Sequence, residues 1–177
     1  MATVKNPCRI LIVDDQEPMR MLLAHYISED LNAEINLAGT CEEAMHLANE
    51  KSYDVILLDL LMPGIGGFEV LKFIRKHSAN KVTPVIIVSI LVKSLAGDGS
   101  MAFDHAVDLG VDGFVSKPVS RSELLAAVRK RYREWRVRGQ RGRTADYLVR
   151  HEGGEPDDGR CRLFVQVGRM KRCTPAF

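Results

Sequence analysis

Residues 55–64 have the sequence Val-Ile-Leu-Leu-Asp-Leu-Leu-Met-Pro-Gly, in which an apolar run ends at Asp59 and a Pro-Gly pair follows. A short, continuous apolar run bounded by turn-forming residues predicts a buried β-strand, here Val55 to Leu58. Strands that are apolar on both faces are typical of parallel sheets covered by helices on both sides. Asp59 is therefore predicted to stand at the carboxyl end of a buried strand.

The same pattern recurs on both sides of this segment, where short β-rich runs alternate with longer stretches of helical spacing. The predicted strands are Cys8 to Val13, Ala33 to Ala38, Val55 to Leu58, Val85 to Val88 and Gly113 to Val115. The predicted helices are Pro18 to Glu29, Thr40 to Glu50, Gly67 to Lys76, Ser100 to Leu109 and Ser120 to about Arg136. This alternation predicts an α/β fold with a doubly wound, five-stranded parallel sheet.

Carboxylates follow two of the predicted strands. Asp14 and Asp15 end the first strand and Asp59 ends the third, so the three converge if these strands are neighbours. Oxygen ligands gathered without His or Cys suit Mg²⁺ or a similar cation. The alternative is that each Asp only caps the turn or helix that follows it. Three carboxylates at strand ends favour the metal site.

Two other polar residues occupy equivalent positions after strands. Ser89 follows the run Val85 to Val88, and Lys117 follows Ser116 and precedes Pro118. A lysine and a hydroxyl at the carboxyl edge of a sheet could bind the oxygens of a phosphoryl group. Taken singly, Ser89 could equally form a turn, and Lys117 could be a solvated charge.

Charge is distributed unevenly along the chain of 177 residues. Residues 1–128 hold 11 Lys and Arg against 17 Asp and Glu, and residues 129–177 hold 14 against 6, which account for the totals of 25 and 23. An acidic body with a basic C-terminal extension predicts two functional parts. The four cysteines are scattered without a CxxC pair, which argues against a zinc site and a disulfide framework. The longest apolar runs are far shorter than a membrane span, so we expect a cytoplasmic protein.

Four segments together resemble the receiver domains of two-component response regulators. They are Val13-Asp14-Asp15, Leu58-Asp59 through Met62-Pro63-Gly64 to Gly67, Val88-Ser89, and Gly110-Val111-Asp112-Gly113-Phe114-Val115-Ser116-Lys117-Pro118. Their order and approximate spacing agree with that family from about Arg9 to Lys130, roughly 70% of the chain. The resemblance implies a flavodoxin-like sheet with strand order 2-1-3-4-5.

The resemblance also implies a role for each site residue. Asp59 is the implied phospho-accepting nucleophile, Lys117 the lysine that pairs with the phosphoryl group, and Ser89 the switch hydroxyl. Phe114 is the implied aromatic whose rotamer reports phosphorylation, with simple core packing as the alternative. The implied Mg²⁺ ligands are Asp15, Asp59 and the backbone carbonyl of Leu61, supported by Asp14. A cis Lys117-Pro118 bond is expected on the same basis.

Some positions depart from the family pattern. Ile90 replaces the small residue expected after Ser89, and its bulk is predicted to narrow access to the site. Leu61 and Leu91 are apolar where a polar side chain could position an attacking water, which predicts slow hydrolysis of the phosphorylated form. Residues 93–100 are predicted to form an enlarged loop that gates the site, holds a partner or is neutral.

The domain prediction is a receiver domain over residues 1–136 and a basic, flexible C-terminal tail over residues 137–177 with one hairpin. The leading functional hypothesis is a signalling protein phosphorylated by a histidine kinase or phosphotransfer protein, which then changes its affinity for a downstream protein partner. Its chemistry would be at most self-phosphorylation and self-dephosphorylation. A homodimer through the helix 100–109, strand 113–115 and helix 120–136 is a further expectation.

The alternative hypothesis is a transcriptional or RNA-directed regulator that binds nucleic acid through the basic helix from Ser120 and the tail. A scaffold without phosphorylation is disfavoured, because every charged residue of the implied site is present.

Overall fold

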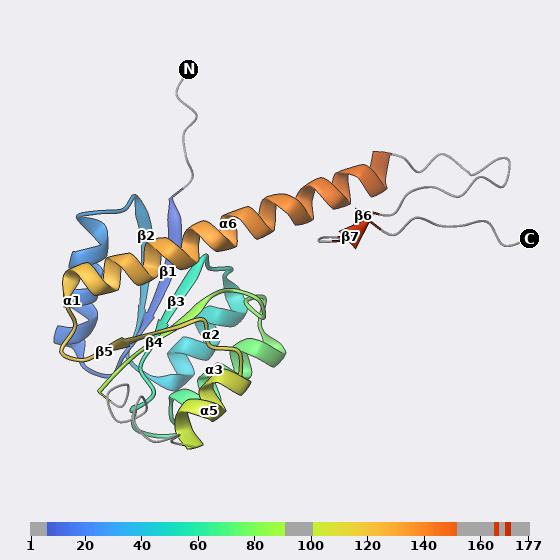
Figure 1. Cartoon of the computed structure of the whole chain (residues 1–177). Coiled ribbons are helices and arrows are strands. Elements are labelled where there is room, and N and C mark those ends of the chain that lie inside the picture. Colours follow the sequence, from blue (N-terminus) through green and yellow to red (C-terminus); the bar gives the residue numbers. More distant parts are fainter. Residues whose placement is uncertain (1–6, 91–100, 152–164, 167–168, 171–177) are drawn as a thin grey trace, which may run out of the picture. The chain divides into compact units, whose positions relative to one another are not determined.

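The computed structural model describes residues 7–90, 101–151, 165–166 and 169–170, with side chains described for residues 7–90 and 104–137. Five parallel strands form one sheet in the order β2-β1-β3-β4-β5, which confirms the predicted fold and strand order (Figure 1). The strands are β1 (Cys8–Val13), β2 (Ala33–Ala38), β3 (Val55–Leu58), β4 (Val85–Ser89) and β5 (Gly113–Ser116). The helices around the sheet are α1 (Glu17–Ser28), α2 (Cys41–Glu50), α3 (Gly67–His77), α5 (Met101–Asp108) and α6 (Arg121–His151).

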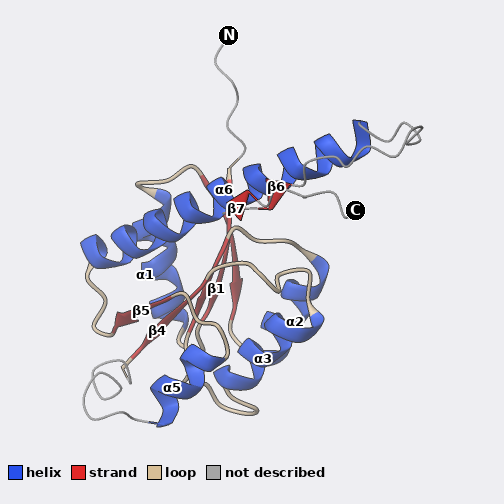
Figure 2. Cartoon of the chain, turned by 45° about the vertical axis from the view of Figure 1, so that its right-hand side comes forward, coloured by secondary structure: helices blue, strands red, loops and turns tan. Residues whose placement is uncertain are grey.

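Alternate residues of the strands face two separate layers of core. On one face, Leu11, Ile56 and Ile87 pack with buried residues of α2 and α3. On the other face, Ile10, Leu57 and Val88 pack with α1 and α6. Figure 2 shows α1 and α6 on one side of the sheet and α2, α3 and α5 on the other. Because both faces are covered, the central strands need apolar residues at every position.

Local signals explain where some helices begin. Thr40 Oγ1 accepts a hydrogen bond from the Glu43 backbone N–H at 3.1 Å, which makes Thr40 the N-cap of α2. The Glu43 carboxylate reaches back to the N–H of Gly39 at 2.8 Å, one residue earlier than in the usual capping box. α3 instead begins after Gly66, whose φ of 81° few other residues adopt.

The prediction that the last helix ends near Arg136 is wrong, because α6 continues to His151. The predicted end followed the apolar stripe, of which Leu124 and Val128 are fully buried and Tyr132 is partly buried. Residues 137–151 contain no proline, and the Arg, Gln, Ala and Leu residues among them favour helix. The other boundaries coincide with those predicted or differ from them by one residue.

The chain divides into two compact units, residues 1–139 and residues 140–177. The second unit contains β6 (Val165–Gln166) and β7 (Arg169–Met170), which pair antiparallel as the predicted hairpin. None of the helices that the structure describes combines the length and apolar composition needed to cross a bilayer.

Candidate functional site

The carboxyl ends of β1 and β3 bring the predicted aspartates together. The two strands are neighbours, with Val13 opposite Leu58, so Asp14 and Asp59 follow at the same edge. The Asp59 backbone N–H continues this pairing by donating to the carbonyl of Val13 at 2.9 Å. One carboxylate oxygen each from Asp14, Asp15 and Asp59 lies within 4.8 Å of the others.

This acidic cluster is partly buried and contains a lysine. Asp14 and Asp59 are 1% and 3% exposed, whereas Asp15 is exposed to solvent. Lys117 Nζ lies 2.7 Å from Asp14 Oδ2 and 2.5 Å from Asp59 Oδ2. Burial lowers the pKa of Lys117, but the close contacts and negative charges of Asp14 and Asp59 outweigh it and hold the pKa above its ordinary value. With all four groups ionised, three carboxylates and one ammonium leave a net negative charge at the edge of the sheet.

Each buried carboxylate also accepts a backbone hydrogen bond. The N–H of Gln16 donates to Asp14 Oδ1 at 2.9 Å, and the N–H of Leu61 donates to Asp59 Oδ1 at 3.0 Å. The turn-capping role considered for each Asp is therefore real and coexists with the cluster. These bonds orient the second oxygen, Oδ2, of both carboxylates toward Lys117.

Asp14 Oδ2 is less completely paired than its short distance to Lys117 implies. The contact has the length of an ion pair but not the angles of a hydrogen bond, so this buried oxygen has no hydrogen-bond donor among the described residues. We therefore treat the interaction as a charge contact that leaves the oxygen able to accept another ligand.

Lys117 and Ser89 come from the ends of adjacent strands. Ser89 pairs with Ser116 at the end of β4 and β5, and the Lys117 N–H donates to the Ser89 carbonyl at 3.2 Å. The Lys117-Pro118 bond is cis, as the resemblance implied. The Ser89 side chain is fully buried, and its Oγ has no hydrogen-bond partner among the described residues. A buried hydroxyl of this kind is available to donate to an incoming oxygen atom.

Phe114 lies two residues before Ser116 on β5, opposite Ile87 of β4. Its ring is partly buried and packs against the core cluster on the α2 and α3 side of the sheet. The core-packing alternative for Phe114 is therefore present in the structure. A change of its rotamer on phosphorylation stays a prediction.

Sequence reasoning assigned no role to Arg20, which holds the loop after β1. Its Nη1 donates to the backbone carbonyls of Asp14 at 2.7 Å and Asp15 at 3.1 Å. The same guanidinium lies against Gly39, where an added Cβ would come within 3.0 Å of Nη1. Arg20 therefore fixes the backbone that carries two of the three carboxylates. No sequence pattern predicts a contact between a helix side chain and the backbone carbonyls of the preceding loop.

Gly67 is the second residue without a predicted role. It begins α3 and donates its N–H to the Leu60 carbonyl at 3.2 Å. A Cβ at this position would lie 2.2 Å from the Asp59 carbonyl oxygen. Because Gly67 has no side chain, α3 can approach the backbone of Asp59 directly.

The departures from the family pattern lie at the surface. Ile90 is 58% exposed and Leu61 is 45% exposed, so neither side chain is enclosed. Truncating Ile90 would therefore remove little buried volume. Leu91 and the loop predicted for residues 93–100 lie outside the described residues.

Comparisons with known proteins agree with this geometry. The family model of the response regulator receiver domain matches residues 10–129. The transcriptional regulatory protein ResD of Bacillus subtilis is 36% identical over 124 residues, 70% of this chain and 48% of that protein. The transcriptional regulatory protein SrrA of Staphylococcus aureus is 35% identical over 120 residues, which are 68% of this chain and 46% of that protein. The chain spans about half the length of these curated relatives.

Solved receiver domains match the fold almost over their full length. The receiver domain of the Francisella response regulator 1452 is 32% identical with a TM-score of 0.62, covering 73% of this chain and 98% of that one. The response regulator domain of Thermotoga maritima CheB is 33% identical with a TM-score of 0.62, covering 72% and 98%. The similarity includes the strand order and the segment with all the clustered side chains. This chain belongs to the response regulator receiver family of two-component signalling.

Proposed function

We propose that this protein accepts a phosphoryl group on Asp59 from a histidine kinase or a phosphotransfer protein. The observation that supports this most is the buried Lys117 ammonium, which contacts both Asp14 and Asp59 at the end of the sheet. A buried charge is costly unless it is paired. Here it is placed where a phosphoryl group attached to Asp59 would bring new negative charge.

The donor is proposed to be a phosphohistidine. An Asp59 carboxylate oxygen attacks phosphorus, the O–P bond forms, and the N–P bond of the donor breaks. The imidazole keeps the electron pair of that bond and leaves as the neutral ring if its other nitrogen is protonated. Asp59 is a weak nucleophile, so the reaction depends on positioning and on neutralising charge. The Leu61 N–H holds Asp59 Oδ1 and leaves Oδ2 toward Lys117.

Receiver domains use Mg²⁺ at an acidic Asp cluster, and the donor set here fits that ion. We propose Asp15, Asp59 and the backbone carbonyl of Leu61 as its ligands, with Asp14 in support. When bound, Mg²⁺ would neutralise negative charge on the transferring group. This assignment is supported by the three clustered carboxylates and by the net negative charge of the cluster. It is also supported by Asp14 Oδ2, which accepts no hydrogen bond among the described residues.

Ser89 and Phe114 are proposed to pass the signal on. The unpartnered Ser89 hydroxyl would donate to a phosphoryl oxygen, which costs no existing hydrogen bond in the described residues. Movement at Ser89 would reach Phe114 through the β4 and β5 pairing. The resulting change would bias the surface formed by α5, β5 and α6 toward a downstream protein or a second copy. The apolar Leu61 and Leu91 are proposed to slow hydrolysis of the aspartyl phosphate.

The test is phosphorylation by phosphoramidate, a small donor with an N–P bond, followed by intact-protein mass spectrometry. We expect one added phosphoryl group with Mg²⁺, and none with EDTA or in Asp59→Asn. Asp108→Asn, which alters an exposed carboxylate on α5, is the matched control and should react like the wild type. Undiminished incorporation in Asp59→Asn would disprove the assignment.

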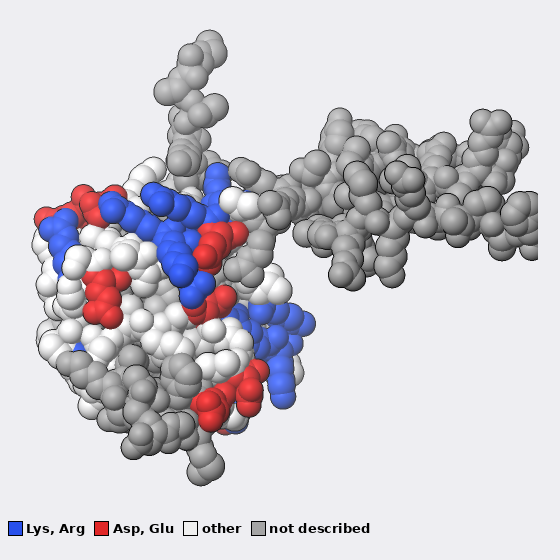
Figure 3. Space-filling view, viewed as in Figure 1, with Lys and Arg blue, Asp and Glu red and all other residues white. Residues whose placement is uncertain are grey.

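A second candidate function is nucleic-acid binding by α6 and the C-terminal residues. It is favoured by the length of α6, which joins Arg129, Arg133, Arg138 and Arg143 in one helix, and by relatives that are transcriptional regulatory proteins. In the first half of α6, Arg121 pairs with Glu29 at 2.9 Å, Arg129 with Asp30 at 2.6 Å and Arg131 with Glu134 at 2.9 Å. Figure 3 shows Lys and Arg side chains interspersed with Asp and Glu on the face that it draws. DNA titrations at two salt concentrations test this function through the expected steep loss of affinity at high salt.

We further propose that residues 1–136 form the receiver domain, that residues 137–177 form a basic C-terminal extension, and that the protein is cytoplasmic. Removing residues 140–177 is expected to leave phosphorylation of Asp59 intact, because every proposed site residue precedes them. Loss of phosphorylation in a truncated protein that still folds would contradict this boundary.

A further inference from the structure

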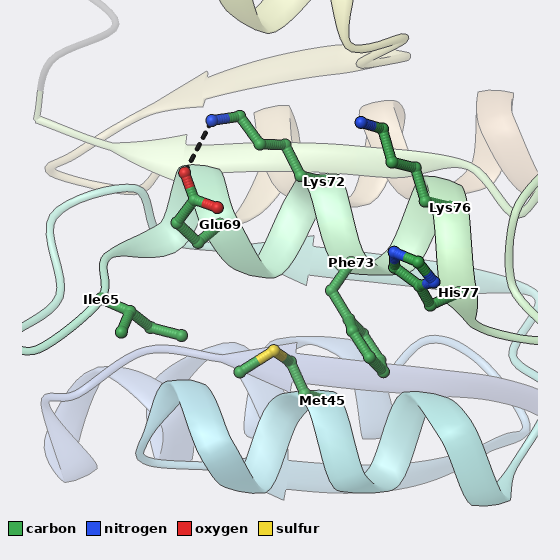
Figure 4. A pocket seen from close by; sticks show the side chains of 7 residues that line it. All are labelled: Met45, Ile65, Glu69, Lys72, Phe73, Lys76 and His77. Atoms are coloured by element: carbon green, nitrogen blue, oxygen red, sulfur yellow. Dashed lines mark hydrogen bonds and ion pairs between the residues drawn. The ribbon is translucent and has the colours of Figure 1, made fainter.

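A groove lies between α2 and α3, on the face of the sheet opposite α1 and α6. Its volume is about 360 Å³. Figure 4 shows the Phe73 ring of α3 pointing toward α2, and the Met45 side chain of α2 extending toward Ile65 at one end of the groove. These three side chains make an apolar floor.

This floor is more exposed than folding requires. Ile65 is 49% exposed, although it lies between two glycines in a loop that could hold a polar side chain at this position. Phe73 is only partly buried, and its ring lies 5.8 Å from the imidazole of His77. Large apolar side chains exposed together mark surfaces that bind other molecules.

The rim of the groove on α3 carries unbalanced positive charge. Lys72 Nζ donates to Glu69 Oε1 at 2.6 Å, so these two charges neutralise each other. Lys76 is exposed and has no ion pair within the part of the chain that the structure describes. Arg75 next to it is directed elsewhere, toward the Thr83 carbonyl and Asp112. The free charge of this rim is therefore the ammonium of Lys76.

We propose that the groove docks a peptide segment of a partner protein that carries two apolar anchor residues and an acidic residue. The anchors would cover Met45, Ile65 and Phe73, and the carboxylate would pair with Lys76. Sites for small molecules enclose most of their ligand, whereas here a floor residue is half exposed. An amphipathic helix laid in a groove matches this geometry better.

The groove is connected to the proposed phosphorylation site through one short loop. Ile65 belongs to the segment between Asp59 and α3, which the hydrogen bond from Gly67 N–H to the Leu60 carbonyl closes at 3.2 Å. A change in the backbone at Asp59 would therefore move part of the floor. Peptide affinity is expected to change on phosphorylation, and this dependence, unlike docking itself, rests on the proposed function.

The test uses a fluorescein-labelled 14-residue peptide with Leu and Phe four positions apart and Glu one turn later, and a scrambled peptide of the same composition. Anisotropy is measured with the full-length, unphosphorylated protein and with Asp59→Asn. We expect saturable binding of the designed peptide to both proteins, and at least a five-fold weaker affinity for the scrambled peptide. Phe73→Ala is expected to weaken binding by about five-fold or more, whereas Val82→Ala, at an exposed position outside the groove, should bind like the wild type.

Charge reversal distinguishes this groove from the basic helix α6. Lys76→Glu is expected to weaken binding by roughly five- to ten-fold, and a peptide with Lys in place of Glu should regain affinity for that variant. Lys130→Glu, on α6, should have no effect. Absence of saturable binding, equal binding of the scrambled peptide, or weakening by Lys130→Glu with none by Lys76→Glu would overturn the proposal. Because docking is measured without phosphorylation, failure of the chemistry at Asp59 would not be mistaken for failure of the groove.

Discussion

Replacing Gly67 with alanine should damage the proposed phosphorylation site without touching any of its side chains. The added Cβ would lie 2.2 Å from the Asp59 carbonyl oxygen and 2.6 Å from the Leu60 Cα. Ordinary contacts of a Cβ begin at 3.4 Å, so α3 and the Asp59 backbone must separate by about 1 Å. Overpacking of this kind typically costs about 1–3 kcal/mol. A displacement of about 1 Å at a reacting group can lower a rate about 100-fold.

Gly64→Ala is the matched control, because it makes the same chemical change in the same loop. Gly64 has a φ of 86° and no atom within 4 Å of the added Cβ. Its substitution should cost about 1 kcal/mol of backbone strain and leave the Asp59 backbone in place. Urea unfolding followed by circular dichroism gives the stability, and the time course of phosphoramidate labelling gives the rate. A Gly67→Ala protein with a rate within two-fold of the wild type, and a stability within about 0.5 kcal/mol of it, would refute the steric argument.

Four further predictions concern single residues. Asn80→Ala should destabilise the protein by about 3 kcal/mol in urea unfolding, because it leaves buried backbone groups without partners. Lys117→Ala should retain Mg²⁺ binding, measured by calorimetry, but lose most phosphoramidate labelling, because it removes a charge partner of the phosphoryl group and no metal ligand. Ile90→Ala should speed that labelling and change stability by less than about 0.5 kcal/mol, since the side chain is 58% exposed; an unchanged or slower rate would contradict a gating role. Burial, followed by the charge of Asp54, raises the pKa of Cys8 to about 12, so iodoacetamide at pH 8.5 should label it only after unfolding. Because the unfolded thiol ionises near its ordinary value of 9.0, stability should fall as pH rises from 9.0 toward 12.

The strands and their order were predictable because covering both faces of a sheet leaves a continuous apolar pattern. Val55 to Leu58 has that pattern, and the structure contains the same four residues as β3. Strand ends were predictable only to within a residue, as with Ser89, which belongs to β4. The end of α6 was not predictable from the apolar residues along one face of the helix, because these stop where the contact with the core stops. A helix can continue beyond that point wherever its residues tolerate helical backbone angles.

The convergence of the carboxylates could be anticipated, but their partners could not. Parallel strands end at a common edge, so neighbouring strands bring Asp14 and Asp59 together whatever their side chains do. The contacts of Arg20 with the carbonyls after β1 depend on where α1 sits relative to the sheet. Asn80 is a stronger example, since its Nδ2 donates to Ala48 and Lys51 and its Oδ1 accepts from Tyr53 N–H. These partners lie about 30 positions away in the chain, and local periodicity carries no information on them.

Ser89 shows where the sequence departs from what stability alone would select. It ends a strand whose other residues are all apolar and fully or almost fully buried, and its own side chain is buried as completely as theirs. A buried hydroxyl without a partner costs about 1–3 kcal/mol, and alanine at this position would avoid that cost. The Lys117 contacts with Asp14 and Asp59 carry a similar cost of burying charge. Both costs fall at the carboxyl edge of one sheet, where a phosphoryl group on Asp59 would supply the acceptor that Ser89 lacks among the described residues. This concentration of unfavourable polar burial at one point, within an otherwise apolar core, is the pattern expected of a binding site and not of a structural one.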